Sequence, residues 1–143
     1  MKNEMISEMK NEVGYNMNNE TFDVVRRMLE LSKTIIEAID HFLERAKEND
    51  IEQCSVMLAS VGNGMDSIVK TFPVIFDKDC VTPDISEECI ARFDDAVRAM
   101  DSAVDAVIAG GMEDLKYWGQ KVRTAFKDWD ELVNKHLRKL SLM

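Results

Sequence analysis

The sequence is poor in residues that interrupt helices and in residues that build chemical sites. Its 143 residues include only two prolines, six glycines and two histidines. So few prolines leave long stretches in which a helix can run without interruption. Neither histidine follows a glutamate at the Glu-x-x-His spacing, which excludes the di-metal site that some helical bundles carry. We therefore expect a largely helical chain that is not an enzyme and holds no cofactor.

Basic residues, long apolar runs and paired cysteines are also scarce. The chain has 18 basic and 27 acidic residues, and a net charge of −9 repels nucleic-acid phosphates and anionic lipid. No apolar run approaches the roughly 20 residues that span a bilayer, and the first ten residues, MKNEMISEMK, lack the apolar core of a signal peptide. The three cysteines, Cys54, Cys80 and Cys89, have no metal-like spacing and are expected to be free thiols. We expect a cytoplasmic protein with neither nucleic acid nor membrane as a partner.

Apolar residues recur at steps of three and four, which is the period of a helix with one buried face. The pattern predicts four helices, over about residues 20–48, 51–72, 85–109 and 113–139. The residues expected to face inward are Val25, Met28, Leu29, Ser32, Ile35, Ile36, Ile39, Phe42, Leu43 and Ala46 in the first helix, and Cys54, Leu58, Val61, Met65, Ile68 and Phe72 in the second. Those expected in the third are Ile90, Phe93, Val97, Met100, Val104 and Val107, and those in the fourth are Leu115, Trp118, Val122, Ala125, Trp129, Leu132 and His136.

Polar residues and glycine mark the ends of these helices. Asp50 with Gln53, and Asp84 with Glu87, have the spacing of a capping box, in which two side chains satisfy free amides at a helix start. Gly110 can adopt the left-handed conformation that ends many helices. Helices of this length with short connections favour an all-α fold, an antiparallel four-helix bundle over residues 19–143. Residues 1–18 form an N-terminal extension that is either flexible or a short helix.

The two predicted helical hairpins have similar patterns. When the second half is aligned on the first, Val61 falls on Val122 and Ile39 on Met100. An internal duplication and two unrelated hairpins of equal length both explain this match. With its glycines in the second helix, the doubled hairpin resembles small uncharacterised bacterial helical domains. That resemblance implies a helical bundle and brings no activity with it.

The stretch SVGNG, residues 60–64, places two glycines inside the second helix. A glycine in a helix costs about 1 kcal/mol relative to alanine, so two glycines this close together indicate a local demand. The favoured interpretation is close approach by a neighbouring helix or room for a large side chain such as that of Trp118 or Trp129. One alternative is a kink or break at Asn63-Gly64, because Asn-Gly also favours turns. A phosphate-binding loop ranks last, because no Gly-Lys-Ser/Thr follows and no strand precedes the stretch. If the protein instead senses a small ligand or a metal, the pocket is expected among Gly62, Gly64, Trp118, Trp129 and His136.

Interaction with another protein is the favoured function. The connection PVIFDKDCVTP, residues 73–83, is long and apolar for a bundle. Its apolar residues either cap the bundle, which we favour, or contact a partner; they are Val74, Ile75, Phe76 and Val81. In the N-terminal extension, Met5 and Met9 are a second candidate contact, because methionine adapts to irregular grooves. We expect an adaptor, a regulator or an export-type chaperone that binds a partner's helix, and a homodimer is left open.

One histidine leaves a phosphotransfer function as a further alternative. His41-Phe-Leu43 resembles the start of the motif of phosphotransfer bundles, whose phosphorylated histidine lies on an exposed helical face. Glu44 and Arg45 replace the lysine and glycine expected next. An acid beside the acceptor would repel a phosphoryl donor, so this alternative ranks last.

Overall fold

The computed structural model describes the backbone of residues 11–76 and 81–142, and the side chains of residues 20–76 and 81–140. It contains α1 (Asn11–Lys47), α2 (Ile51–Val69), the short α3 (Phe72–Phe76), α4 (Pro83–Ala109), α5 (Met112–Leu137) and the 3-10 turn η1 (Arg138–Leu142). Within these ranges there is no strand. The predicted all-α four-helix bundle is confirmed, with α1 beginning earlier than expected.

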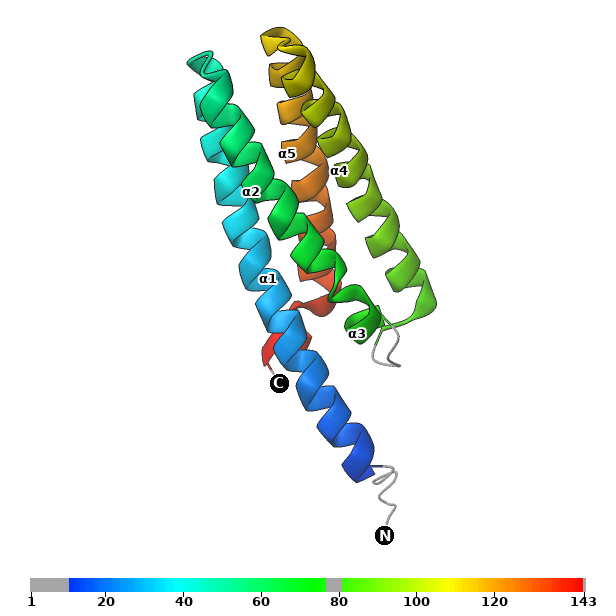
Figure 1. Cartoon of the computed structure of the whole chain (residues 1–143). Coiled ribbons are helices and arrows are strands. Elements are labelled where there is room, and N and C mark those ends of the chain that lie inside the picture. Colours follow the sequence, from blue (N-terminus) through cyan, green and yellow to red (C-terminus); the bar gives the residue numbers. More distant parts are fainter. Residues whose placement is uncertain (1–10, 77–80, 143) are drawn as a thin grey trace.

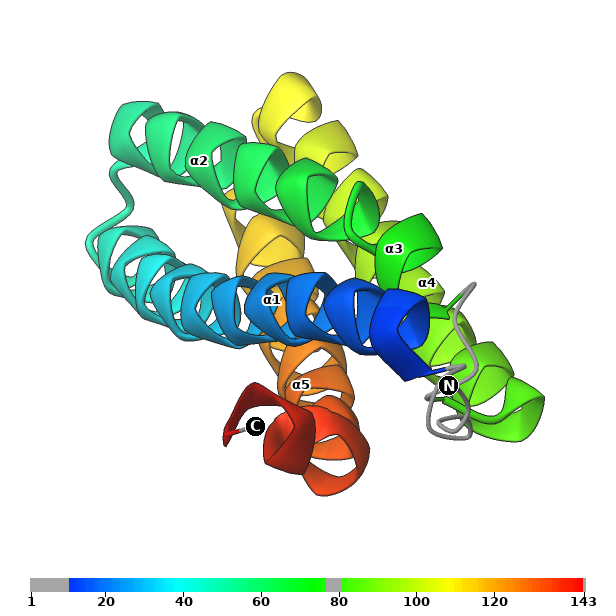
Figure 2. The same ribbon diagram turned by 90° about the horizontal axis from the view of Figure 1, so that it is seen from below.

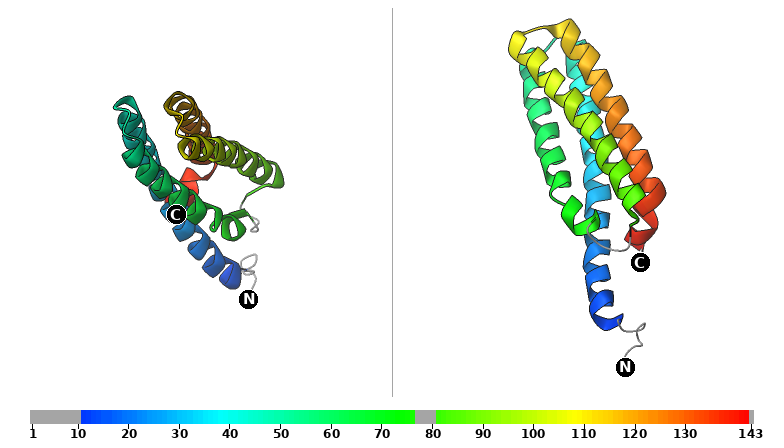
Figure 3. Two further views of the ribbon diagram at one scale, coloured as in Figure 1. Left: turned by 45° about the horizontal axis from the view of Figure 1, so that its top comes forward. Right: turned by 90° about the vertical axis from the view of Figure 1, so that its right-hand side faces the viewer.

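The four long helices form two antiparallel hairpins, α1–α2 and α4–α5 (Figure 1). α1 packs against both α2 and α5, and α4 packs most extensively against α5, whereas α2 and α4 touch least among the neighbouring long helices. α3 and η1 lie at the end of the bundle opposite the two hairpin turns, and η1 folds back against α1 (Figures 1 and 2). The first turns of α1 extend beyond that end (Figure 3).

Local caps fix the ends of α2 and α4. The carboxylate of Asp50 accepts a hydrogen bond from the backbone N–H of Gln53 at 3.1 Å, which is one half of the predicted capping box. The N–H of Asp50 donates instead to the carbonyl of Arg45 at 3.1 Å. The predicted capping box of Asp84 with Glu87 is wrong, because α4 begins earlier and Thr82, in an extended conformation, is its N-cap. Pro83 explains the difference, since proline suits the first helical position, where an N–H would lack a helical partner. Gly110, with φ of 72°, ends α4 as predicted.

The inward faces of α1 and α2 are confirmed. Every residue expected inside is buried except Ile36 and Phe72, which are partly buried against the core. α2 ends at Val69, so Phe72 belongs to α3. The buried hydroxyl of Ser32 on α1 donates a hydrogen bond to the carboxylate of Asp130 on α5 at 2.6 Å, which joins the two hairpins.

The inward face predicted for α4 is wrong in part. Ile90 and Val104 are 45% and 38% exposed, and alanines take their places inside. The buried residues of α4 are Ser86, Cys89, Phe93, Ala96, Ala99, Met100, Ala103 and Ala106. The prediction favoured large apolar residues, whereas the close approach of α4 to α5 selects small ones. The inward face predicted for α5 is also wrong in part. Leu115, Val122 and Trp129 are buried as predicted, but α5 also buries Gly119, Phe126, Val133 and Leu137. Trp118, Ala125, Leu132 and His136 are only partly buried.

The glycines of SVGNG lie within α2, which runs unbroken from Ile51 to Val69. The predicted alternative of a break at Asn63-Gly64 is therefore wrong, as is a phosphate-binding loop, while a kink there stays a prediction. The favoured interpretation, close approach by a neighbouring helix, is confirmed at Gly64. A Cβ added there would lie 2.7 Å from Cγ1 of Ile35 on α1. Gly62 faces α4 instead and has more room, since an added Cβ would lie 3.5 Å from Cε of Met100.

α3 closes one end of the bundle with aromatic side chains. The ring centroid of Phe72 lies 5.2 Å from that of Phe93 and 6.4 Å from that of Trp129. Ile75 and Val81 are buried in the same core. The described part of the 73–83 connection therefore caps the bundle, which was the favoured of its two predicted roles.

Candidate functional site

The surface between α2 and α4 contains a groove with a volume of about 500 Å³, here called the α2–α4 groove. Because the two helices are antiparallel, the beginning of α2 faces the end of α4 (Figure 1). The groove is lined by Ser55, Leu58, Ala59, Gly62, Asn63, Met65 and Asp66 of α2, and by Val97, Met100, Asp101, Val104, Val107 and Ile108 of α4. These residues come from the two neighbouring long helices that pack least closely.

α2 contributes three small residues to the groove, beside the larger Leu58, Asn63, Met65 and Asp66. Ser55, Ala59 and Gly62 recur at steps of four and three, so they lie on one face of the helix. None of the three has a side chain long enough to reach across to α4. A Cβ at Gly62 would make only an ordinary contact with Met100, which shows that the space between the helices is not filled at this position.

α4 contributes larger apolar residues. Val97 and Val107 are partly buried along the groove, while Val104 is 38% and Ile108 79% exposed. The sequence predicted that Val97, Val104 and Val107 lie in the core, and it did not identify Ile108 as a candidate binding residue. Isolated exposed apolar residues are ordinary, but a contiguous apolar surface in a hollow indicates a binding surface.

The charged groups that line the groove are both acidic. Asp66 lies on α2 and Asp101 on α4, and no lysine, arginine or histidine joins them. α2 has no basic residue along its whole length. In the described part of the chain, neither Asp66 nor Asp101 takes part in an ion pair. The α2–α4 groove is therefore apolar with an unneutralised negative charge.

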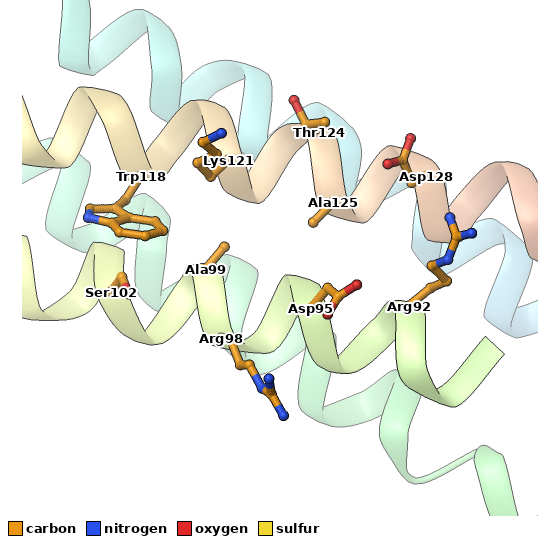
Figure 4. Close-up of a pocket in the computed structure, with 10 residues that line it drawn as sticks. All are labelled: Arg92, Asp95, Arg98, Ala99, Ser102, Trp118, Lys121, Thr124, Ala125 and Asp128. Atoms are coloured by element: carbon orange, nitrogen blue, oxygen red, sulfur yellow. The ribbon is translucent and has the colours of Figure 1, made fainter. Parts of the chain in front are cut away.

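A second hollow, of about 420 Å³, lies on the outer surface between α4 and α5 (Figure 4). Trp118 stands beside a floor that includes Ala99 and Ala125, and the charged residues around it are Arg92, Asp95, Arg98, Lys121 and Asp128. The cations already have partners. Arg92 pairs with Glu88 at 3.4 Å, Arg98 pairs with Asp94 at 2.9 Å, and the ammonium of Lys121 lies 5.3 Å from the ring centroid of Tyr117. Figure 4 shows Arg98 pointing away from α5.

The predicted pocket of glycines, tryptophans and histidine is not formed. Gly62 lines the α2–α4 groove, whereas Trp118 lies in the hollow between α4 and α5. Gly64 packs against α1. Trp129 is fully buried among aromatic rings, and His136 is partly buried in the last turn of α5. The prediction failed because residues on one helical face can still point toward different neighbouring helices.

The predicted partner contacts in residues 73–83 differ in how deeply the structure buries them. Ile75 and Val81 are buried, so their side chains are core residues and not an exposed contact. Val74 and Phe76 are partly buried, and for them a role in binding stays a prediction. Met5 and Met9 lie outside the described residues.

His41 is exposed on α1, as its place off the buried face predicted. It shares a shallow polar hollow with Asp40 and Glu44 of its own helix and with Arg123 of α5, which donates a hydrogen bond to Asp40 at 2.8 Å. In the described part of the chain, no three His, Cys, Asp or Glu side chains are grouped as a metal site requires. No helix there has the length and apolar character needed to cross a membrane.

Two cysteines are buried free thiols, Cys54 on α2 and Cys89 on α4. Burial raises the pKa of both, and that of Cys89 reaches about 11, with the charge of Glu88 adding to the shift. A thiol is a nucleophile only as the thiolate, so these two groups are held in the unreactive form.

Neither a curated protein nor a solved structure matches the chain. A family model described as a domain of unknown function, DUF8042, matches residues 23–117, which include most of α1, all of α2 and α4, and the start of α5. The α2–α4 groove thus lies wholly within the matched region. The chain belongs to the DUF8042 family, a family of domains of unknown function.

Proposed function

We propose that the protein is a non-catalytic interaction module that binds a helix of a partner protein in the α2–α4 groove. The observation that carries this proposal is the groove itself, in which exposed Val104 and Ile108 face the small residues of α2. A hollow with an apolar floor suits the apolar face of an amphipathic helix. An adaptor, a regulator and an export-type chaperone are the forms that such a module takes.

The buried thiols support two further parts of the proposal. Cys54 and Cys89 are unpaired, as is usual in a reducing compartment, so we place the protein in the cytoplasm. Their raised pKa values argue against these two thiols as nucleophiles, in keeping with a non-catalytic role. A small-ligand sensor that uses the hollow beside Trp118 is the weaker proposal, because the cations around that hollow are already engaged.

Photo-cross-linking in cells that express the protein tests the proposed function. One variant carries a photoreactive phenylalanine at Ile108 in the groove, and a matched variant carries it at Tyr117, which is 55% exposed on α5. The expected result is a covalent adduct with another protein from position 108 and none from position 117. An adduct of twice the chain's own mass would identify a homodimer instead. Equal adducts from both positions, or none from position 108, would refute the proposed function.

A further inference from the structure

The shape of the α2–α4 groove limits what can occupy it. Its α2 side runs from Ser55 to Asp66, twelve residues or about 17 Å of helix. The polar side chains along it are few: Ser55 and Asn63, with one aspartate on each helix. An extended peptide would leave most of its backbone N–H and C=O groups without partners there. A helix satisfies its own backbone, so a helix of about three turns is the occupant that fits.

The negative charge of the groove lies away from Ile108. Ala59 and the uncharged Ser55 face the end of α4 that carries Ile108, so the lining at this end holds no charged residue. Asp66 lies in the last turn of α2, where unpaired helix carbonyls add partial negative charge. The groove therefore offers an apolar surface at one end and negative potential toward the end near α3.

The charged residues that line the groove indicate which residues the partner helix carries beside its apolar stripe. Asp66 and Asp101 have no cation beside them in the lining, and Asp105 is exposed one turn beyond Asp101. The basic residues nearest to these aspartates in the sequence are Lys70, exposed just past the end of α2, and Arg98 on α4, which pairs with Asp94 at 2.9 Å. Neither of them lines the groove. A partner with lysine or arginine beside its apolar stripe would neutralise these carboxylates.

A second copy of the same surface would do the opposite. Two α2–α4 grooves placed face to face would bring Asp66 and Asp101 of each copy toward those of the other, in chains that each have a net charge of −9. Like charges brought together across an interface disfavour the complex. The charge pattern thus argues for a different protein and against self-association through this surface.

We infer that the partner segment is a basic amphipathic helix, with an apolar stripe that fills the end of the groove near Ile108 and with lysine or arginine side chains directed at Asp66 and Asp101. This inference rests on the proposed function and specifies the chemistry of its partner. Association through such a surface is expected to weaken as salt concentration rises, because exposed charges are screened.

Three labelled synthetic peptides test the inference by fluorescence anisotropy with the full-length protein. They share one leucine stripe over about four helical turns and differ only in flanking residues, which are lysine, glutamine or glutamate. The lysine peptide is expected to bind about tenfold more tightly than the glutamate peptide at low salt, as two surface ion pairs allow. Equal binding of the lysine and glutamate peptides would overturn the inference.

Variants of the protein separate the local groove charges from its overall charge. Asp66→Asn with Asp101→Asn is expected to abolish most of the preference for lysine over glutamate, measured as the ratio of the two peptide affinities. Glu37→Gln with Glu131→Gln removes the same charge from exposed positions outside the groove, and it should preserve the preference. If both double variants lose the preference equally, it comes from net charge alone and the inference is wrong.

A bulky substitution tests the location. Ala59→Trp, in the groove, is expected to weaken binding of all three peptides, whereas Ser60→Trp, exposed on the next residue and outside the lining, should not. If only Ala59→Trp weakens peptide binding, the result supports the α2–α4 groove as the binding site. If both substitutions weaken binding equally, the groove is not the binding site. If the peptides fail to bind while the cross-link from position 108 is obtained, the inferred basic helix is wrong and the proposed function stands. If the cross-link fails as well, both are wrong.

Discussion

Alanine substitutions at three helical glycines distinguish an open groove from packed helix interfaces. A Cβ added at Gly62 would lie 3.5 Å from Cε of Met100, which is an ordinary contact across the α2–α4 groove. At Gly64 it would lie 2.7 Å from Cγ1 of Ile35, and at Gly119 it would lie 2.5 Å from Cε2 of Phe42. The first glycine faces α4, while the other two face α1.

The expected free energies follow from these distances. Replacing glycine by alanine inside a helix gains about 1 kcal/mol, and Gly62→Ala should keep that gain. At Gly64 the buried side chain of Ile35 must shift, and overpacking costs about 1–3 kcal/mol, so the net effect is a loss of up to about 2 kcal/mol. Gly119→Ala should lose more, because the flat ring of Phe42 is 1% exposed and has little freedom to move.

Urea denaturation followed by circular dichroism measures the three variants against the parent protein. The expected order of unfolding free energy is Gly62→Ala, parent, Gly64→Ala and Gly119→Ala, from highest to lowest. Each kcal/mol should shift the melting temperature by roughly 3–4 °C in a chain of this size. If Gly62→Ala destabilises the protein as much as Gly64→Ala does, then α2 and α4 are closely packed and the groove does not exist.

Two further predictions concern α4. Ala103→Asp buries a carboxylate without a partner and should lower the free energy of unfolding by about 3 kcal/mol or more. Val104→Asp, at a 38% exposed position, should lower it by less than about 1 kcal/mol. If chemical denaturation gives the reverse order, Val104 and not Ala103 belongs to the buried face of α4, as the sequence predicted. The pKa of Cys89 is raised from 9.0 to about 11 in the folded protein, so its contribution to stability is complete below pH 9 and is lost as pH rises toward 11. The unfolding free energy of the parent should therefore fall by up to roughly 2–3 kcal/mol more over this range than that of Cys89→Ala, and parallel pH profiles would contradict the assignment.

The sequence was sufficient for α1 and α2. Their inward residues are large, apolar and regularly spaced, and polar residues occupy most other positions, so periodicity alone identified the buried face. The cap at Asp50 and the left-handed conformation of Gly110 could also be predicted from the sequence, because each depends on a few neighbouring residues. Local signals were reliable where the cause of the structure was itself local.

The sequence failed where the structure depends on which helices meet. α4 carries two stripes, one of alanines and one of valines, and hydropathy alone favours the valines as core. The alanines at 96, 99, 103 and 106 are buried instead, because α4 lies close against α5. The regular spacing of those alanines was the signal that could have revealed the packed face. The groove was missed for the same reason, since its floor was counted as core.

The separate alanine and valine stripes of α4 explain why a groove exists. Its alanine stripe faces α5 and permits the most extensive helix contact in the bundle, while its valine stripe faces the side of α2. There α2 offers Ala59 and Gly62, where leucine or isoleucine would have closed the space with the chain's own atoms. Larger residues at these two positions would bury more apolar surface and stabilise the fold. Small residues forgo that stability and leave Val104 and Ile108 accessible, which is the arrangement that binding a partner helix requires.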